Sequence, residues 1–181
     1  MPDAKHGELC QWFPAPFAVD VAAIEAVVEY VDIVHPAAVT GPSITFSCAE
    51  QFMMYCKAAR FNDTTTMHRV LATADPKEQK RLGKQVEGFN EDWWAPVKSA
   101  VVVVGNVAKF GQNPKLRGKL IATGDRLLVE AASRDRVWGI GYTEKHAMSF
   151  REHWGENRLG LALMEARRIL KDKQANKHTW E

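Results

Sequence analysis

Apolar residues recur every three or four positions along several stretches of this chain, and this spacing places them on one face of an α-helix. It predicts a helix over about 49–59 and a final helix over about 157–171. The apolar segment 92–110 contains the run 101–104, which has β propensity, but its setting between alanines favours a buried helix. Most of the chain is therefore expected to be helical.

Polar residues next to proline mark where several helices begin. Asp75-Pro76 and Asn113-Pro114 have the pattern of a cap followed by proline in the first helical turn. Asn62-Asp63 is expected to end one helix and cap the next. The helices are thus predicted to be short and sharply bounded.

Short strands are expected where brief apolar runs lie between turn residues. Residues 44–46 form one such run, and 127–130 and 137–140 form a candidate strand pair around a charged turn. The dense apolar segment 19–34 is predicted to be a helix that ends at His35-Pro36, although its β-branched residues also suit a strand.

Length and composition indicate one domain that spans residues 1–181. The chain has 46% apolar residues and no internal repeat or linker, and its net charge of +2 does not by itself indicate a nucleic-acid or membrane partner. No window approaches the roughly 20 apolar residues of a membrane span. The odd number of cysteines, three, suits a reducing compartment. We expect an intracellular, cytoplasmic protein, with the nucleus as an open alternative, and no membrane partner.

The segment after Ser47 carries the first candidate site. Glu50 and Lys57 are seven residues apart, about two helical turns, so an acid and an amine share one helical surface. Such a pair could act on one sugar. The alternative is a capping box, in which Glu50 accepts a hydrogen bond from the backbone N–H of Ser47. Local sequence leaves both possibilities open.

Other candidates are scattered along the chain. Trp94 and Trp138 could stack on a nucleobase or fill the core. Asp135 could be part of a solvated charged turn, Lys109 could complement a helix C-terminus, and Gly139 could allow the backbone close to a ligand. Walker and G-x-G-x-x-G loops and histidines at metal-ligand spacing are missing, so we expect no metal and no cofactor.

The order of several motifs resembles the NADAR family, also called YbiA-like. The resemblance covers about residues 44–172 and leaves 1–43 as an N-terminal extension, in which 19–42 is longer and more apolar than the family's usual hairpin. The matching segments are A-E-Q-F-M-M-Y-C-K-A, D-P-K-E-Q-K-R-L-G-K-Q-V, W-A-P-V-K, A-K-F-G-Q-N-P-K-L, L-I-A-T-G, L-V-E-A, D-R-V-W-G-I-G and W-G-E-N-R-L-G-L-A-L-M-E-A-R.

This resemblance implies a fold and a set of site residues. The fold would be mainly α, a single compact orthogonal helical domain with one or two short β-strand pairs. The implied site residues are Glu50, Lys57 and Asp135 for catalysis, and Trp94, Trp138, Lys109, Gly139 and Asn157 for substrate binding.

The resemblance also implies an N-glycosidase, which hydrolyses a ribose–base bond. The expected substrate contains ADP-ribose, attached to guanine in DNA, RNA or a nucleoside. Two alternatives stay open: an N-glycosidase acting on phosphoribosylaminopyrimidine intermediates of riboflavin biosynthesis, and a module that binds ADP-ribose or NAD without turnover. Two catalytic routes stay open. A carboxylate such as Glu50 could act electrostatically or as an acid or base, or the amine of Lys57, the preferred nucleophile, could attack the anomeric carbon and form a Schiff base.

Overall fold

The computed structural model describes residues 6–30 and 32–178. The chain divides into two compact units, residues 1–117 and 118–181, and each is described by itself. The first unit contains, in order, η1 (Gly7–Leu9), β1 (Phe17–Asp20), α1 (Val21–Val28), β2 (Ser43–Phe46), α2 (Ala49–Arg60), α3 (Thr64–Leu71), α4 (Pro76–Gly83), α5 (Glu91–Trp94) and α6 (Lys98–Gln112). Helix α7 (Pro114–Ile121) crosses the boundary between the units, and the second unit contains α8 (Glu144–Ala147), η2 (Met148–His153) and α9 (Arg158–His178). The prediction of a mainly α protein is confirmed.

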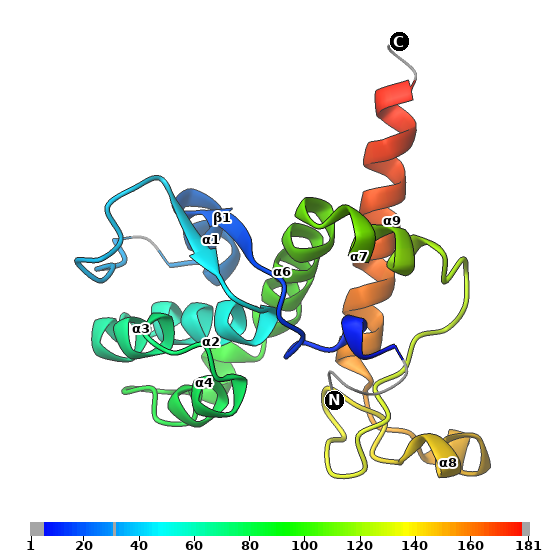
Figure 1. Cartoon of the computed structure of the whole chain (residues 1–181). Helices are drawn as coiled ribbons and strands as arrows, with labels where there is room; N and C mark the ends of the chain where they lie inside the picture. The colour runs from blue at the N-terminus through cyan, green and yellow to red at the C-terminus, as the bar shows by residue number, and fades with distance from the viewer. Residues whose placement is uncertain (1–5, 31, 179–181) are drawn as a thin grey trace. The chain divides into compact units, whose positions relative to one another are not determined.

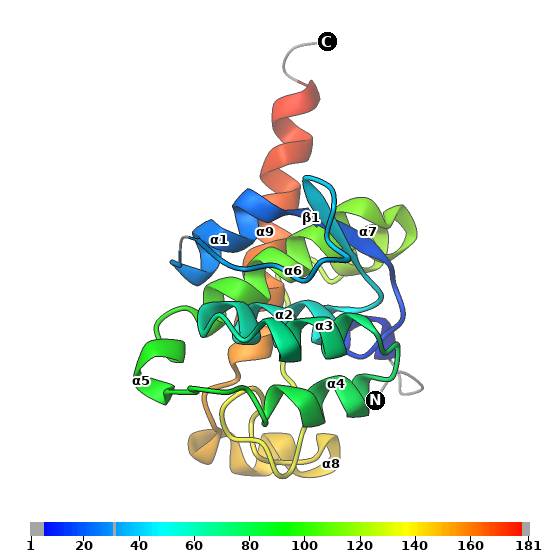
Figure 2. The same cartoon turned by 90° about the vertical axis from the view of Figure 1, so that its left-hand side faces the viewer.

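Helix α2 forms the centre of the first unit. It contacts α1, α3, α4 and α6, and Figures 1 and 2 show it between the layer of β1 and α1 and the helix α4. The ring of Phe52 packs edge-on against Phe46 and Phe17 from the two strands. On its other side, a Cβ atom at Gly105 of α6 would lie 2.6 Å from the Phe52 ring, so glycine permits the close approach of α2 and α6.

The two strands form an antiparallel pair in which Phe17 lies opposite Phe46. The strand predicted at 44–46 is confirmed, but the helix predicted over 19–34 is wrong at both ends. The segment 17–20 alternates between buried and more exposed residues and pairs with β2, so its β-branched character decides its structure. The helix then ends early because Glu29 adopts the left-handed conformation, with φ of 50°.

Helix starts in the first unit follow the predicted caps. Asp63 accepts a hydrogen bond from the N–H of Thr66, and Asp75 accepts one from Lys77 with Pro76 in the first turn. The valine run 101–104 lies inside α6, as expected for a buried helix. Among the described residues, no helix is both long enough and apolar enough to cross a membrane.

The second unit is organised by irregular segments that pack against the start of α9. The strand pair predicted at 127–130 and 137–140 is wrong, since neither segment forms a strand. The two segments do touch, because the N–H of Ile140 donates to the carbonyl of Glu130 at 2.9 Å. The carbonyl of Trp138, which a strand would use to pair with its neighbour, instead bonds to the first turn of α9. There it accepts a hydrogen bond from the N–H of Leu159.

Candidate functional site

Glu50 lies in the first turn of α2 and its residue is only 6% exposed. Its backbone N–H donates to the carbonyl of Gln11 at 3.1 Å, which ties the start of the helix to the N-terminal segment. The capping-box alternative is wrong, because Cys48 is the N-cap and the N–H of Ser47 donates to Oε1 of Gln51 at 2.7 Å. The side chain one position further along the helix therefore performs the capping that was considered for Glu50.

Lys57 lies in the last turn of the same helix. Its Nζ donates to the carbonyl of Gly83 at 2.7 Å and lies 3.8 Å from the centre of the Phe89 ring. Desolvation by burial lowers the pKa of Lys57, the carboxylate of Glu91 raises it, and the ammonium of Lys98 lowers it. A lysine with a lowered pKa carries more neutral amine at neutral pH, and neutral amine is the nucleophilic form.

Lys109 is a second buried amine, on α6. Its Nζ donates to the carbonyls of Glu8 at 3.1 Å and Cys10 at 2.8 Å, and burial lowers its pKa to about 8. Residues 8–11 thus bind both Lys109 and the start of α2, where Glu50 lies. The amine has no exposed surface in this arrangement, and the substrate-binding role of Lys109 stays a prediction.

The tryptophan pair of α5 separates into a buried and an exposed side chain. Trp94 is 4% exposed and Trp93 is 61% exposed. The element is held at its start by Asn90, whose Oδ1 accepts the N–H of Trp93, and from α2 by Arg60, whose Nε donates to the carbonyl of Trp93 at 3.2 Å. Trp93 is therefore the tryptophan of this pair that is accessible for stacking on a ligand. The sequence prediction named Trp94 and missed Trp93, although the two are adjacent in the sequence.

In the second unit, Asp135 is bonded to the backbone that carries Trp138. Its Oδ1 accepts the N–H of Val137 at 3.0 Å and the N–H of Trp138 at 2.7 Å. This carboxylate therefore shapes the turn before Trp138, whatever chemistry it also performs. Two backbone donors on one oxygen leave the second oxygen of Asp135 outside these bonds.

Gly139 and Asn157 join the same set of irregular segments. A Cβ atom at Gly139 would lie 2.8 Å from the carbonyl oxygen of Glu130, so the close approach that glycine permits here is to backbone. Asn157 has a φ of 52°, its Oδ1 accepts the N–H of Glu130, and its Nδ2 donates to the carbonyl of Leu128. The predicted ligand contacts of Gly139 and Asn157 stay predictions.

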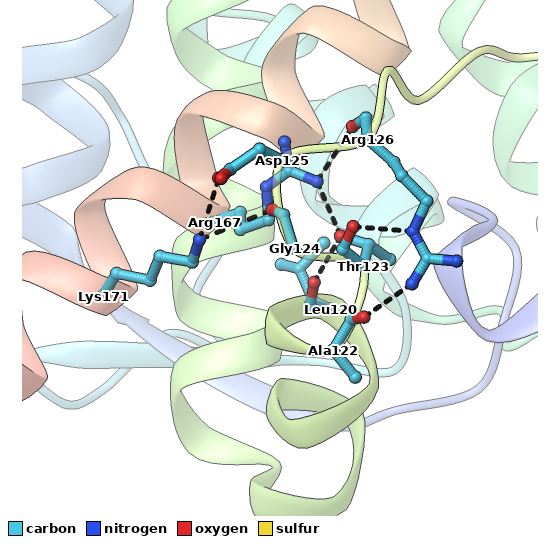
Figure 3. A network of polar contacts seen from close by, with 8 residues as sticks. All are labelled: Leu120, Ala122, Thr123, Gly124, Asp125, Arg126, Arg167 and Lys171. Carbon is cyan, nitrogen blue, oxygen red and sulfur yellow. Dashed lines mark hydrogen bonds and ion pairs between the residues drawn. The ribbon is translucent and has the colours of Figure 1, made fainter.

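The L-I-A-T-G motif forms a cation-rich turn at the end of α7. Figure 3 shows the guanidinium of Arg167, from α9, donating to Oγ1 of Thr123 at 2.6 Å and to the carbonyl of Arg126 at 3.0 Å. Arg126 itself donates to the carbonyls of Thr123 and Ala122, so positive charge meets the C-terminal end of α7. The motif therefore has a structural role: it holds the turn after α7 against Arg167 of α9.

Each unit thus carries half of the predicted site. The first unit contains Glu50, Lys57, Trp94 and Lys109, and the second contains Asp135, Trp138, Gly139 and Asn157. That all eight line one cleft stays a prediction. Across residues 6–30 and 32–178, no three His, Cys, Asp or Glu side chains gather in a way that could hold a metal ion.

Comparison with known proteins identifies a family. A family model described as the NADAR domain matches residues 1–171, which includes the N-terminal 43 residues. "N-glycosidase R617" of Acanthamoeba polyphaga mimivirus is 36% identical over 159 residues, which is 87% of this chain and 84% of the relative. "N-glycosidase YbiA" of Escherichia coli is 33% identical over 64% of this chain and 67% of its own length.

Two further similarities bear on function and fold. "Riboflavin biosynthesis protein VVA0006" of Vibrio vulnificus is 28% identical over 94% of this chain, which corresponds to 37% of that longer protein. The NMR structure of E. coli YbiA superimposes with a TM-score of 0.68 at 24% identity, covering 97% of this chain and 84% of that one. At this identity the structural likeness concerns the fold alone.

Proposed function

Because the chain belongs to the NADAR domain family, we propose that it is an N-glycosidase, a hydrolase that cleaves the bond between a ribose and a base. The observation that carries this proposal is its 36% identity, over most of both chains, to a relative named an N-glycosidase. A second relative with that name, YbiA, supports the same activity.

The amine of Lys57 supplies a nucleophile for this reaction. Its lone pair attacks C1 of the ribose, the C1–N bond to the base breaks, and the base leaves with the electron pair and takes up a proton. The lysine nitrogen, now bonded to C1, loses a proton. Its lone pair then forms a double bond to C1 while the ring C1–O bond breaks and the ring oxygen takes up a proton, which gives a protonated Schiff base. Water then adds to C1 and expels the amine, so that the net reaction is hydrolysis.

Glu50 and Asp135 are the proposed acids. Cleavage places positive charge on C1 while the base needs a proton, and a carboxyl group can serve either need. Glu50 starts the helix that carries Lys57, so both residues are presented by one rigid element. The carboxyl of Glu50 and the amine of Lys57 could therefore act together on a single sugar.

The substrate we propose is ADP-ribose attached to guanine in DNA, RNA or a nucleoside. A second candidate is a phosphoribosylaminopyrimidine intermediate of riboflavin biosynthesis, favoured by the name of the Vibrio vulnificus relative. Both contain a ribose–base bond, and they differ in the base and in the phosphate groups on the sugar.

Incubation with both substrates separates the candidates. Chromatography should show release of unmodified guanosine from ADP-ribosylated guanosine, and faster release than from the aminopyrimidine. Reversed preference would favour the riboflavin candidate. Tight ADP-ribose binding by calorimetry, with no base released from either substrate, would identify a non-catalytic reader and overturn the proposed activity.

Borohydride trapping tests the lysine route. Reduction during turnover should attach the sugar irreversibly to Lys57, and Lys57→Ala should abolish both the adduct and base release. Lys77→Ala, on the exposed surface of α4, is the matched control and should retain both. Normal turnover by Lys57→Ala with no adduct in the unmodified protein would exclude this mechanism.

A further inference from the structure

Phe89 lies in the segment between α4 and α5 and was not identified from the sequence. Its residue is 41% exposed, and the Nζ atom of Lys57 lies over its ring, 3.8 Å from the ring centre. An ammonium is attracted to the face of an aromatic ring within roughly 6 Å, so this contact is a close one. A partly exposed side chain therefore touches the candidate nucleophile directly.

The backbone on both sides of Phe89 is held in place. Before it, the N–H of Glu87 donates to Oδ2 of Asp63 at 2.9 Å. Gly88 then adopts the left-handed conformation, with φ of 66°, which glycine accepts without strain. After it, the side chain of Asn90 caps the first turn of α5. The segment thus presents the ring from a defined position.

The ring of Phe89 and the end of α4 hold the Lys57 amine between them. Phe61, which follows the last residue of α2, packs edge-on with the Phe89 ring at 5.5 Å between ring centres. Gly83 is the last residue of α4, and its carbonyl accepts a hydrogen bond from Nζ of Lys57 at 2.7 Å. A Cβ atom at Gly83 would clash with Sδ of Met54, so glycine permits the close approach of α4 to α2 on which this bond depends.

The two contacts define a direction at the nitrogen of Lys57. An amine nitrogen has four tetrahedral directions, and the bond to Cε takes one of them. The carbonyl of Gly83 accepts one N–H, and the ring face of Phe89 attracts a second. The remaining direction carries a proton in the ammonium and the lone pair in the neutral amine, which is the nucleophilic form.

We propose that Phe89 is a positioning residue, whose ring, together with the carbonyl of Gly83, directs the lone pair of Lys57 towards the ribose carbon. The ring and the carbonyl each present partial negative charge, so in the free protein they also stabilise the ammonium. Phe89 therefore fixes the orientation of the amine and favours its protonated form. This inference rests on the proposed role of Lys57, but the contact itself can be measured without substrate.

Competitive labelling of amines, read at Lys57 by peptide mass spectrometry over a range of pH, tests the contact in the full-length protein. Phe89→Leu should move the midpoint of labelling down by about 0.4–0.7 pH unit, because the ammonium loses the attraction of the ring face. Glu91 and Lys98, the charged groups that act on this amine, are the same in every variant. Phe89→Tyr keeps the ring face and should keep the midpoint. Tyr30→Leu, at another exposed aromatic residue of the first unit, is the matched control and should keep it as well.

Base release from ADP-ribosylated guanosine tests the orientation of the amine. Phe89→Leu should lower kcat about tenfold to a hundredfold, because a small displacement of a reacting group has an effect of this size. KM should change little, since the ring acts on the amine and not on the substrate. Phe89→Tyr should restore most of kcat, and Tyr30→Leu should release base like the unmodified protein.

A labelling midpoint that Phe89→Leu leaves unchanged would overturn the proposal. So would a midpoint that rises, since a rise means that packing is lost and water reaches the amine. Normal kcat in Phe89→Leu would overturn it too. Absence of release by the unmodified protein would refute the proposed activity, while the labelling would still show whether Phe89 holds the amine. Should Phe89→Leu fail to fold, Phe89→Met makes the same comparison, because it also lacks a ring.

Discussion

The pH dependence of unfolding should reveal the buried amine of Lys109. Its pKa is about 8 in the folded protein, against 10.5 for an ordinary lysine. Between these values the unfolded chain holds a proton that the folded protein has released, so unfolding takes up a proton and the free energy of unfolding rises with pH. A lowering of this size corresponds to roughly 3 kcal/mol, spread over about pH 8 to 10.5.

Substitution isolates this contribution from the rest of the protein. Lys109→Met keeps much of the side-chain volume and removes the ionisable group together with its bonds to Glu8 and Cys10. Urea unfolding, followed by far-ultraviolet circular dichroism from pH 7 to 10.5, gives the free energy of unfolding at each pH. The unmodified protein should gain roughly 3 kcal/mol relative to Lys109→Met over this range.

The control is Lys77→Met, which replaces an exposed lysine on α4 and should follow the unmodified protein at every pH. A difference between the unmodified protein and Lys109→Met that stays constant or falls with pH would refute the reasoning. Such a result would mean that water or the two carbonyls stabilise the ammonium in the folded protein as well as bulk solvent does.

Substitutions at three other residues test the contacts around the candidate site. Gln51→Ala should lower the free energy of unfolding by about 2–4 kcal/mol in urea titrations, because the N–H before α2 and buried carbonyls lose their partner. Asp135→Asn keeps an oxygen for the N–H of Trp138 and should unfold like the unmodified protein, whereas Asp135→Ala should lose about 1–3 kcal/mol; loss of base release in the asparagine variant would then indicate a chemical role. Gly139→Ala places a Cβ atom against the carbonyl of Glu130 and should lower the melting temperature measured by calorimetry by several degrees, about 2–4 °C per kcal/mol lost for a chain of this length; an unchanged melting temperature would mean that the backbone can move aside.

Predictions from local sequence succeeded where the residues that determine a helix start lie next to one another in the sequence. The caps at Asp63 and Asp75 could be predicted because each carboxylate accepts a hydrogen bond from a backbone N–H only two or three residues further along the chain. They failed where a remote partner decided the outcome. Residues 17–20 became a strand because β2 pairs with them, and 127–130 remained irregular because Asn157 bonds to the backbone there.

The candidate site shows the same limit. The resemblance of motifs indicated Lys57 and Glu50, but the sequence had no signal that Lys98 on α6 and Glu91 on α5 form an ion pair, because these residues come from different helices. The exposure of Trp93 beside a buried Trp94 also depends on how α5 packs.

By itself, the sequence determined the family, the predominance of helices and the residue types available for chemistry, because motif order and helical spacing are written along the chain. Tertiary structure alone decided which amines lose contact with water and which charges face them. Burial and Coulomb interaction depend on distances between remote segments, and folding sets those distances. Lys57 and Lys109 have ordinary sequence contexts, and their lowered pKa values arise only when α4, Phe89 and the segment 8–11 cover them.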